Sequence, residues 1–538
     1  MKKILKLGTR RSLLAWTQSS WVAREIEKTS PDIAVELVGI ETQGDRIQDI
    51  PLQKVEGKEF FVAEIDQALR AGSVDLTVHS LKDLSLDRPS EFVSAAIPRR
   101  ENSRDVILFG PHARARLAAG QALKIGTSSP RRLENLRGFL DRALPFTEKG
   151  HPRAQFVEIR GNVNTRLSRV HEAVGAEKYL DGVVLAFAGL IRLNSDSEAR
   201  EKMAPLMRGI HWMVLPLTEN PTAPGQGALA IECRANDSAV QGVLKKLDHA
   251  TSRAEVAAER AILRRSGGGC HQKFGASALT LDGVGKVLVI RGRDQAGVEM
   301  NEIQWDRPAK PAGLGASGAA GGAAAGAAGG TAAAGGVRAW DGSLHRAEKA
   351  TRGQSAIQEA THARLDPVSQ ASCVFVAHSR AVPTAEVAAA ISGPGQRVWT
   401  AGVQSWWKLA EKGIWVEGCA EGFGWDHIRK TLSEPILGLS KPDGWVILTH
   451  EDSSVEEGTK VATYRISEES ERDASQDLVG YTHFFWGSGT QFQKHIRHVP
   501  PGAHHACGAG KTAKVLRDAG VAFQVFPSIE EWRKWIQN

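Results

Sequence analysis

A cysteine follows three consecutive glycines in the stretch Ser266-Gly267-Gly268-Gly269-Cys270-His271. Glycine has no Cβ, so this stretch can adopt positive φ and let a bulky group approach the backbone closely. The preceding segment, 253–265, has apolar residues three and four positions apart and predicts a helix. Its arginines would lower the pKa of the Cys270 thiol and favour the thiolate. These residues alone leave two interpretations open: a buried structural thiol, the usual state of an isolated cysteine, or a reactive one.

Arginines also recur at turns rich in Gly, Ser and Thr, as in Gly8-Thr9-Arg10-Arg11-Ser12, Gly126-Thr127-Ser128-Ser129-Pro130-Arg131-Arg132 and Arg160-Gly161-Asn162-Val163-Asn164-Thr165-Arg166. Guanidinium groups bind carboxylates bidentately and keep their charge at any working pH. Backbone N–H groups at a helix start add an anion site. The turns therefore predict a cleft for a ligand with several carboxylates or phosphates. The Gly-x-x-x-x-Gly-Lys-Ser/Thr loop typical of phosphate sites is absent, which favours carboxylates.

These turns must be positioned by an alternation of strands and helices that runs through the first 230 residues or so. The predicted strands are 4–7, 34–40, 74–80, 123–125, 155–159, 181–186 and 229–232. Such alternation indicates an α/β fold with mostly parallel sheets and helices on both faces. Ligands bind at the carboxyl ends of such strands, where the strand 74–80 delivers Lys82 and Asp83. We expect two similar α/β lobes that face each other across a cleft.

Composition limits the remaining classes. The chain has 538 residues, enough for about three to four domains, and a formal net charge of +7. Its five cysteines are odd in number and form no Cys-x-x-Cys pair, which argues for a reducing compartment and against a disulfide framework or a metal site. The N-terminus lacks the apolar core of a signal peptide, and no apolar run is long enough to span a membrane. We expect a cytoplasmic protein that binds no membrane.

The turns above, with Val78-His79-Ser80-Leu81-Lys82-Asp83, Pro224-Gly225-Gln226-Gly227-Ala228 and Gly268-Gly269-Cys270, resemble in order the motifs of hydroxymethylbilane synthase, also called porphobilinogen deaminase. The resemblance covers about residues 1–306. It implies two periplasmic-binding-protein-like, doubly wound lobes and a small α+β domain that carries the cysteine. The implied boundaries are 1–105 with 228–245 for the first lobe, 106–227 for the second, and 246–306 for the small domain.

The resemblance also implies the chemistry, in which four porphobilinogen molecules are joined head to tail with release of ammonia. It implies a dipyrromethane cofactor on a thioether to Cys270, and Asp83 as the catalytic carboxyl that protonates the leaving amine and stabilises the azafulvene cation. The implied cofactor-binding residues are Lys82, Thr127, Ser129, Arg131, Arg132, Arg160 and Gly161. The implied substrate-binding residues are Arg10, Arg11, Ser12, Lys58, Arg166 and Gln226. Two segments depart from the family pattern, the long 139–153 and the polar 271–275 after the cysteine.

The last third of the chain differs in composition. Residues 307–370 predict a linker, because 311–336 are almost wholly Gly and Ala and have nothing to bury. Residues 371–538 are tryptophan-rich and contain a weak internal repeat, with small-residue turns at 401–405 and 508–512, which indicates a two-lobed α/β domain. This domain is similar to uroporphyrinogen-III synthase, which cyclises hydroxymethylbilane, and Tyr464 lies where that family has a tyrosine. Its opening strand and helix are not visible, so a catalytically silent domain stays an alternative.

Two other classes compete for the N-terminal part. An anion-binding receptor would share the two lobes and the arginine-bearing turns, but it has no use for a thioether at Cys270. A nucleic-acid-binding protein would interleave basic residues with exposed aromatic ones, whereas these arginines fall at Gly and Ser turns. We therefore expect porphobilinogen as the partner, no nucleic acid, and a monomer.

Overall fold

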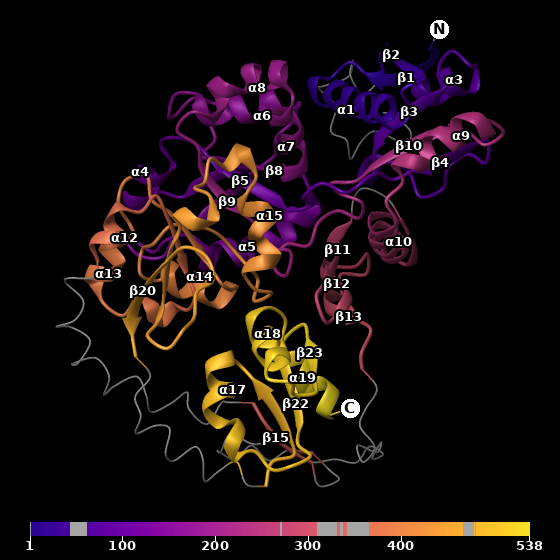
Figure 1. Cartoon of the computed structure of the whole chain (residues 1–538). Coiled ribbons are helices and arrows are strands. Elements are labelled where there is room, and N and C mark those ends of the chain that lie inside the picture. The colour runs from indigo at the N-terminus through magenta and orange to yellow at the C-terminus, as the bar shows by residue number, and fades with distance from the viewer. Residues whose placement is uncertain are drawn as a thin grey trace. The chain divides into compact units, whose positions relative to one another are not determined.

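The computed structural model describes residues 2–42, 62–268, 272–308, 331–333, 337–341, 365–465, 478 and 480–537 (Figure 1). The chain divides into two compact units. The first unit comprises Met1–Leu279, Leu288–Glu302 and Glu434–Leu437, and the second comprises Thr280–Val287, Ile303–Ser433 and Gly438–Asn538. Cys270, Lys58 and nearly all of the predicted Gly/Ala tether lie outside the described residues.

The first lobe of the first unit is a five-stranded sheet of order β2-β1-β3-β10-β4. Its elements are β1 (Lys3–Arg10), α1 (Leu13–Thr29), β2 (Ile33–Ile40), α3 (Ala63–Arg70), β3 (Leu76–Ser80), the 3-10 turn η2 (Leu81–Asp83), β4 (Phe92–Ala96), β10 (Leu229–Arg234) and α9 (Ser238–Leu244). The apolar positions of these strands and of α1 form one core, in which Leu7, Val22, Leu76 and Ile231 are fully buried. The core fixes the strand ends that carry Arg10 and Lys82.

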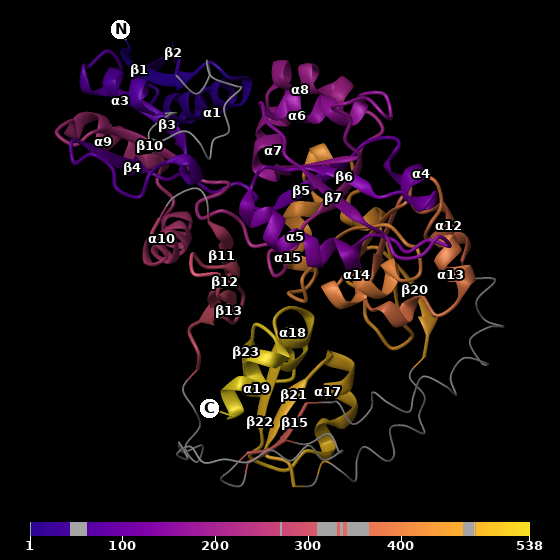
Figure 2. The same cartoon turned by 180° about the vertical axis from the view of Figure 1, so that it is seen from behind.

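The second lobe is a five-stranded sheet of order β7-β6-β8-β5-β9, and Figure 2 shows β5, β6 and β7 from behind. Its elements are β5 (Asp105–Phe109), α4 (Ala113–Ala118), β6 (Leu123–Gly126), α5 (Pro130–Ala143), β7 (Ala154–Val157), α6 (Val163–Ser168), β8 (Gly182–Ala186), α7 (Phe187–Ser195), α8 (Ser197–Met203) and β9 (His211–Val214). Every residue of β5 is buried, as expected for the central part of a sheet covered on both faces.

The expectation of mostly parallel strands holds for four of the five strands in each sheet, and one strand in each is reversed, so both sheets are mixed. In the first lobe β10 runs antiparallel to β3 and β4, and in the second lobe β5 runs antiparallel to β8 and β9. Each of these two strands directly follows the point where the chain crosses from one lobe to the other. A strand that enters from the neighbouring lobe starts at the opposite end of the sheet, and so its direction is reversed.

A third, smaller sheet of order β11-β12-β13 follows the long helix α10 (Ala250–Arg265). Its strands are β11 (Lys273–Leu281), β12 (Gly285–Arg293) and β13 (Glu299–Trp305). Ile262 of α10 packs in one core with Phe274, Ala276 and Leu288 of the sheet. Cys270 belongs to the connection between α10 and β11.

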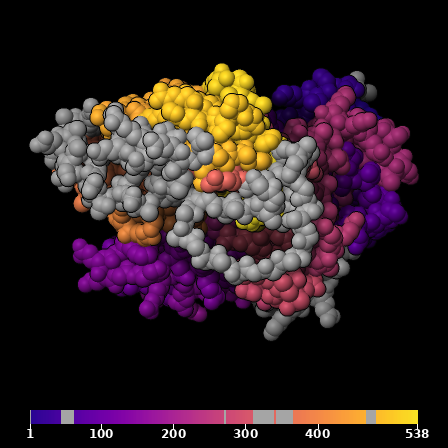
Figure 3. All heavy atoms as spheres, turned by 90° about the horizontal axis from the view of Figure 1, so that it is seen from below, coloured from indigo at the N-terminus to yellow at the C-terminus, as the bar shows by residue number. Residues whose placement is uncertain are grey.

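The second unit contains two further five-stranded sheets, of order β18-β17-β16-β19-β20 and β14-β15-β21-β22-β23. The strands are β14 (Thr331–Ala333), β15 (Val337–Trp340), β16 (Cys373–Val376), β17 (Arg397–Thr400), β18 (Val416–Cys419), β19 (Val446–His450), β20 (Thr459–Tyr464), β21 (His483–Trp486), β22 (His504–Gly508) and β23 (Phe523–Phe526). The helices are α12 (Asp366–Gln370), α13 (Ala385–Ala390), α14 (Val403–Ala410), α15 (Trp425–Leu432), α17 (Gly489–His495), α18 (Lys511–Asp518) and α19 (Ile529–Gln537). Figure 3 shows most of the visible yellow atoms, which are nearest the C-terminus, gathered in one region of this face.

The predicted linker 307–370 needs correction, because it contains β14, β15 and α12. β15 pairs in parallel with β21, and the buried Trp340 ring lies 5.2 Å from the Trp486 ring. The four residues of β15, beside a Gly/Ala run, are too few to show a strand periodicity, so the sequence did not predict this strand. In the described part of the chain, no helix combines the length and apolar character needed to cross a membrane.

Candidate functional site

A cavity of about 200 Å³ opens where strand ends of both lobes meet. The first lobe contributes Arg10 and Ser12 from the end of β1, and Lys82 and Asp83 from η2 after β3. The second lobe contributes Arg192 of α7, which follows β8, and the crossing segment before β10 contributes Gln226. Five of the predicted site residues, Arg10, Ser12, Lys82, Asp83 and Gln226, therefore line one cavity. The other predicted residues that the structure describes do not line it: Arg11, Thr127, Ser129, Arg131, Arg132, Arg160, Gly161 and Arg166.

Two serines of the predicted turns start helices. The Ser12 hydroxyl oxygen accepts the Ala15 N–H at 3.4 Å as N-cap of α1, and the Ser129 hydroxyl oxygen accepts the Arg132 N–H at 3.5 Å as N-cap of α5. Pro130 occupies the first turn of α5, where its missing N–H costs nothing. Because the cap uses only the oxygen as an acceptor, each hydroxyl keeps a proton to donate to an anion. Gly8 to Arg10 belong to strand β1, which corrects the expected turn at these residues.

The turn before α5 is held by its own hydroxyl groups. The buried Thr127 hydroxyl oxygen accepts the Ser129 N–H at 3.3 Å. The Ser128 hydroxyl donates to the Ile159 carbonyl at 2.5 Å and accepts the Ile159 N–H at 3.0 Å. These bonds tie the end of β6 to the chain that leaves β7, so the turns at Thr127 and at Arg160 are fixed next to each other.

Arg131 and Arg132 are buried and share one carboxylate, Asp105. The Arg131 Nη2 donates to Asp105 Oδ2 at 2.7 Å, and the Arg132 Nη2 donates to Asp105 Oδ1 at 2.6 Å. Their Nη1 atoms donate to the carbonyls of Pro221 and Val184. Burial would raise the pKa of Asp105, but the two guanidinium groups hold it well below its usual range. The Nε atoms of both arginines are buried and meet no acceptor among the described residues.

The turn at Arg160 adds more positive charge. Arg166 Nε donates to the Gly161 carbonyl at 2.8 Å, and Gly161 has φ +102°, a conformation that favours glycine. Burial, with the neighbouring Arg132 and Arg160 guanidinium groups, lowers the pKa of Arg166 to about 10. Within the described residues, the Arg160 guanidinium has neither a hydrogen-bond acceptor nor a carboxylate partner. The cluster therefore carries net positive charge, which the Asp83 carboxylate opposes at Arg166.

Lys82 and Asp83 are adjacent on η2, so an ammonium and a carboxylate stand side by side at the cavity. Lys82 Nζ donates to Gln226 Oε1 at 3.3 Å. Burial lowers the pKa of Lys82 and the Asp83 carboxylate raises it, while the Arg132 guanidinium lowers it further. Asp83 is exposed, so its carboxyl can reach a ligand in the cavity. The pair can hold an anion at the ammonium and exchange a proton at the carboxyl.

Two cavity residues escape prediction from the sequence. Arg192 donates from Nη2 to the Gly227 carbonyl at 2.6 Å, and burial lowers its pKa to about 10. Its only sequence signal was its place shortly after the strand 181–186, since its orientation depends on the phase of α7. His79 lies on β3 in the cavity wall, with Nε2 3.0 Å from the Thr77 hydroxyl.

Behind His79 lie two buried carboxylates, Asp66 and Glu232, whose oxygens come near enough to the ring to resemble a metal site. Arg88 already bridges them, with Nη2 2.8 Å from Asp66 Oδ1 and 2.7 Å from Glu232 Oε2. We interpret this cluster as an ion pair that supports the cavity wall.

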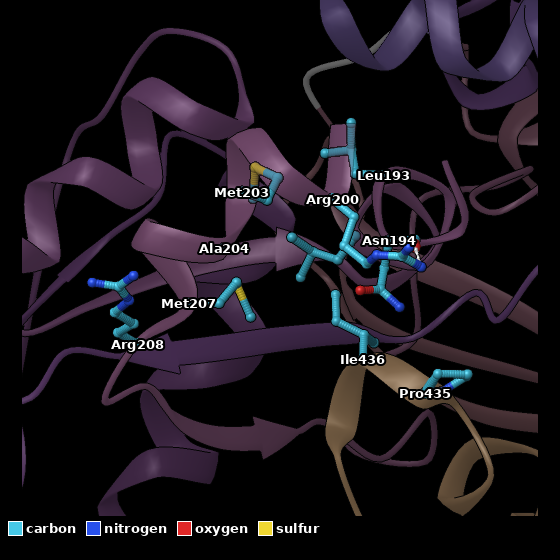
Figure 4. Close-up of a pocket in the computed structure, with 10 residues that line it drawn as sticks. Leu193, Asn194, Arg200, Met203, Ala204, Met207, Arg208, Pro435 and Ile436 are labelled. Carbon is cyan, nitrogen blue, oxygen red and sulfur yellow. Dashed lines mark hydrogen bonds between the residues drawn. The ribbon is translucent and has the colours of Figure 1, made fainter. Parts of the chain in front are cut away.

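A second hollow in the first unit, of about 280 Å³, lies beside α7 and α8 (Figure 4). Its walls are mainly apolar, as at Met203, Met207 and Ile436. The hydrogen bond drawn in Figure 4 joins Arg200 to the Asn194 carbonyl at 3.5 Å. None of the predicted site residues lines it. The chemistry therefore concentrates at the first cavity.

A cavity between two α/β lobes, with a lysine–carboxylate pair and additional guanidinium groups nearby, is typical of a protein that binds a polyanionic ligand. The family model described as porphobilinogen deaminase, dipyrromethane cofactor binding domain, matches residues 5–242. The porphobilinogen deaminase of Brevibacillus brevis is 39% identical over 273 residues, 51% of this chain and 79% of the relative. That of Roseiflexus sp. is 37% identical over 317 residues, 59% of this chain and 94% of the relative. The chain therefore belongs to the porphobilinogen deaminase family, which are transferases.

One solved structure, PhnD1 from Prochlorococcus marinus with methylphosphonate, covers 46% of this chain and 83% of its own at 14% identity and a TM-score of 0.26, too low to support an argument.

The cofactor of the matched domain is a dipyrromethane, and the residues present fit a group of this kind. Among the described residues, the Nε donors of Arg131 and Arg132 and the Arg160 guanidinium have no acceptor, and they would provide positive charge and hydrogen-bond donors for its carboxylates. The same cations would be costly to bury without an anion.

Proposed function

We propose that residues 1–306 join four porphobilinogen molecules head to tail, release ammonia and yield hydroxymethylbilane. The observation that carries this proposal is the convergence of Lys82 and Asp83 with cations of both lobes on one cavity. A porphobilinogen carries an acetate and a propionate, so a growing chain needs a guanidinium or hydroxyl donor for each carboxylate that leaves water.

Asp83 is the catalytic residue in this proposal. Its carboxyl gives a proton to the departing amine of the substrate, and the resulting carboxylate stabilises the positive charge left on the pyrrole. Its exposure at the cavity and its position beside Lys82 support this role. Arg10, Arg11, Ser12, Lys58, Arg166 and Gln226 bind the substrate.

The dipyrromethane, bound through a thioether to Cys270, supplies the primer to which pyrroles are added. Lys82, Thr127, Ser129, Arg131, Arg132, Arg160 and Gly161 would hold it. Arg131 and Arg132 act here through their Nε donors, because their Nη2 atoms donate to Asp105 and their Nη1 atoms donate to backbone carbonyls. Thr127 shapes the turn, and Ser129 offers its hydroxyl proton beside the cap.

The intact mass of the purified protein tests the attachment. We expect extra mass equal to two condensed pyrroles, and its loss in Cys270→Ser together with the loss of porphobilinogen consumption. Cys233→Ser is the matched control, because Cys233 is buried in the first lobe and burial raises its pKa to about 11, which keeps it an unreactive thiol. A polypeptide without added mass that still consumes porphobilinogen would refute the proposal and favour priming without a covalently attached cofactor.

For the second unit we propose cyclisation of hydroxymethylbilane to uroporphyrinogen III. Tyr464 ends β20 with its ring 5.8 Å from the His450 ring, and burial raises the pKa of its phenol, so the phenol stays protonated and can assist loss of water. Type III product from porphobilinogen, reduced in Tyr464→Phe, would support this role. Type I product alone would show a silent domain. We further propose that the protein is cytoplasmic and that it is a monomer. Sedimentation of the purified chain would test the oligomeric state.

A further inference from the structure

We infer that Asp105 is a positioning residue that orients Gln226 and thereby holds the Lys82 ammonium beside Asp83. Asp105 is the first residue of β5, where the chain has just crossed into the second lobe, and its side chain is fully buried. Its carboxylate accepts from Arg131 and Asn220 at Oδ2, and from Arg132 and Gln226 at Oδ1. This inference rests on the proposed role of Asp83.

The first step of the argument is the orientation of the Gln226 amide. Its Nε2 donates to Asp105 Oδ1 at 2.9 Å and to the Ser103 carbonyl at 2.7 Å, so both amide hydrogens are used. A flipped amide would point its oxygen at a carboxylate and a carbonyl, neither of which can donate. Asp105, together with the Ser103 carbonyl, therefore makes Gln226 Oε1 face the opposite way.

The second step is what that oxygen meets. Gln226 Oε1 accepts from Lys82 Nζ at 3.3 Å, at the cavity where Asp83 is exposed. The charged groups facing Lys82 are Asp83 on its own turn, Arg131 and Arg132 on α5, and Asp105 on β5. The two arginines disfavour an ammonium here and the two carboxylates favour it. Asp105 thus supports Lys82 twice, through the oriented amide and through its negative charge.

The test compares Asp105→Asn with Asp181→Asn in the full-length protein. Asp181 is an equally buried carboxylate of the second lobe, bonded to Arg116 and to the Tyr179 hydroxyl, and does not line the cavity. Both variants remove one buried charge, so both should lose stability. Only Asp105→Asn should make Lys82 easier to deprotonate. Acetic anhydride labelling of Lys82, read by peptide mass, should then reach half its maximal rate about one pH unit lower, or run about tenfold faster at a fixed lower pH.

Turnover provides the second readout. In Asp105→Asn, Lys82 should lose its proton at a lower pH than in the wild type. The alkaline limb of the kcat profile should therefore move about one pH unit toward neutral, with KM changing less. If Asp105→Asn fails to fold, Gln226→Met provides a second test. It keeps the side-chain volume and removes the acceptor, so it should shift Lys82 labelling in the same direction. Unchanged labelling in both variants, or the same shift in Asp181→Asn, would overturn the inference. If Asp83→Asn keeps normal turnover, the proposed function fails instead, whatever Lys82 does.

Discussion

The two units of the chain use their interiors differently. In the first unit, Arg131 and Arg132 are buried and share one carboxylate, Asp105, and the half-buried Arg166 adds to the positive charge at Arg132. In the second unit the largest fully buried side chains are tryptophans, among them Trp399, Trp445 and Trp486. Desolvated cations are costly unless anions balance them, whereas buried indoles stabilise a fold directly. The first interior is therefore organised for a ligand, and the second is organised first for packing.

Both units contain solvated and buried charged contacts, and the two kinds differ in what the loss of a partner costs. Exposed pairs in the second unit, such as Lys494 with Asp452, are partly solvated. Such pairs add less than about 1 kcal/mol each and impose little on neighbouring groups. The Arg88 and Asp105 networks of the first unit are buried, so removal of one partner leaves a desolvated charge and costs about 3–5 kcal/mol. Mutations can test whether function follows this division.

The largest effect is expected for Asp83→Asn. The amide cannot protonate the leaving amine or carry the negative charge, so turnover of porphobilinogen should fall by about 10² to 10⁴. Because Asp83 is exposed, the thermal midpoint should stay near that of the wild type, and the cofactor mass on Cys270 should be retained. Asp87→Asn, an exposed carboxylate on the same loop, is the control and should keep turnover. Near-normal turnover in Asp83→Asn would remove the first unit's claim to chemistry at this cavity.

Local rules explain how much of this site the sequence could predict. An α/β fold follows from the strand and helix alternation, and the helix starts at Ser12 and Ser129 follow from hydroxyl and proline chemistry. The meeting of Arg10 with Lys82 at one cavity follows from the rule that ligands bind at strand ends. Each of these inferences uses residues that are close in sequence or strands that are parallel neighbours.

The rest depends on contacts between distant residues, which no local pattern records. Asp105 is 26 residues from Arg131 and 121 residues from Gln226, and it reads in the sequence as one acidic residue at a strand start. The antiparallel entry of β5 and β10 depends on the lobe crossings. β15 is a strand only because β21 and Trp486 receive it, since its neighbours in sequence are Gly and Ala.

A smaller but still large effect is expected on stability from Trp486→Ala. The Trp486 ring contacts Trp340 at 5.2 Å and Phe492 at 5.4 Å, and its Nε1 donates to His505 Nδ1 at 3.0 Å. Truncation should cost about 3–5 kcal/mol and lower the unfolding transition of the second unit. Porphobilinogen consumption should persist at temperatures where that unit has unfolded.

The reciprocal variant for the Trp486 experiment is Trp212→Ala in β9. Trp212 is buried in the second lobe, against Phe187 at 6.0 Å, so its loss should lower the temperature at which consumption is lost. Calorimetry with activity measured at each temperature distinguishes the two. A single transition that both variants lower equally would contradict the division into two units with separate interiors.

The smallest effect is expected from His483→Phe on the pH dependence of stability. It tests whether packing in the second unit disfavours the protonated form of His483. Burial, with the His504 ring stacked at 4.6 Å, lowers the pKa of His483 to about 4 from 6.5. The folded state therefore binds fewer protons than the unfolded state between these values, so the stabilising contribution is complete above about pH 6.5 and is lost as the pH falls toward 4. Tryptophan fluorescence during urea unfolding should show a loss of about 3 kcal/mol over this window. His483→Phe should flatten the pH dependence, whereas His112→Phe, at an exposed position of the first unit, should not. An unchanged slope in His483→Phe would mean that other groups set the acid sensitivity of the second unit, and that its interior suppresses charge less than its tryptophan packing implies.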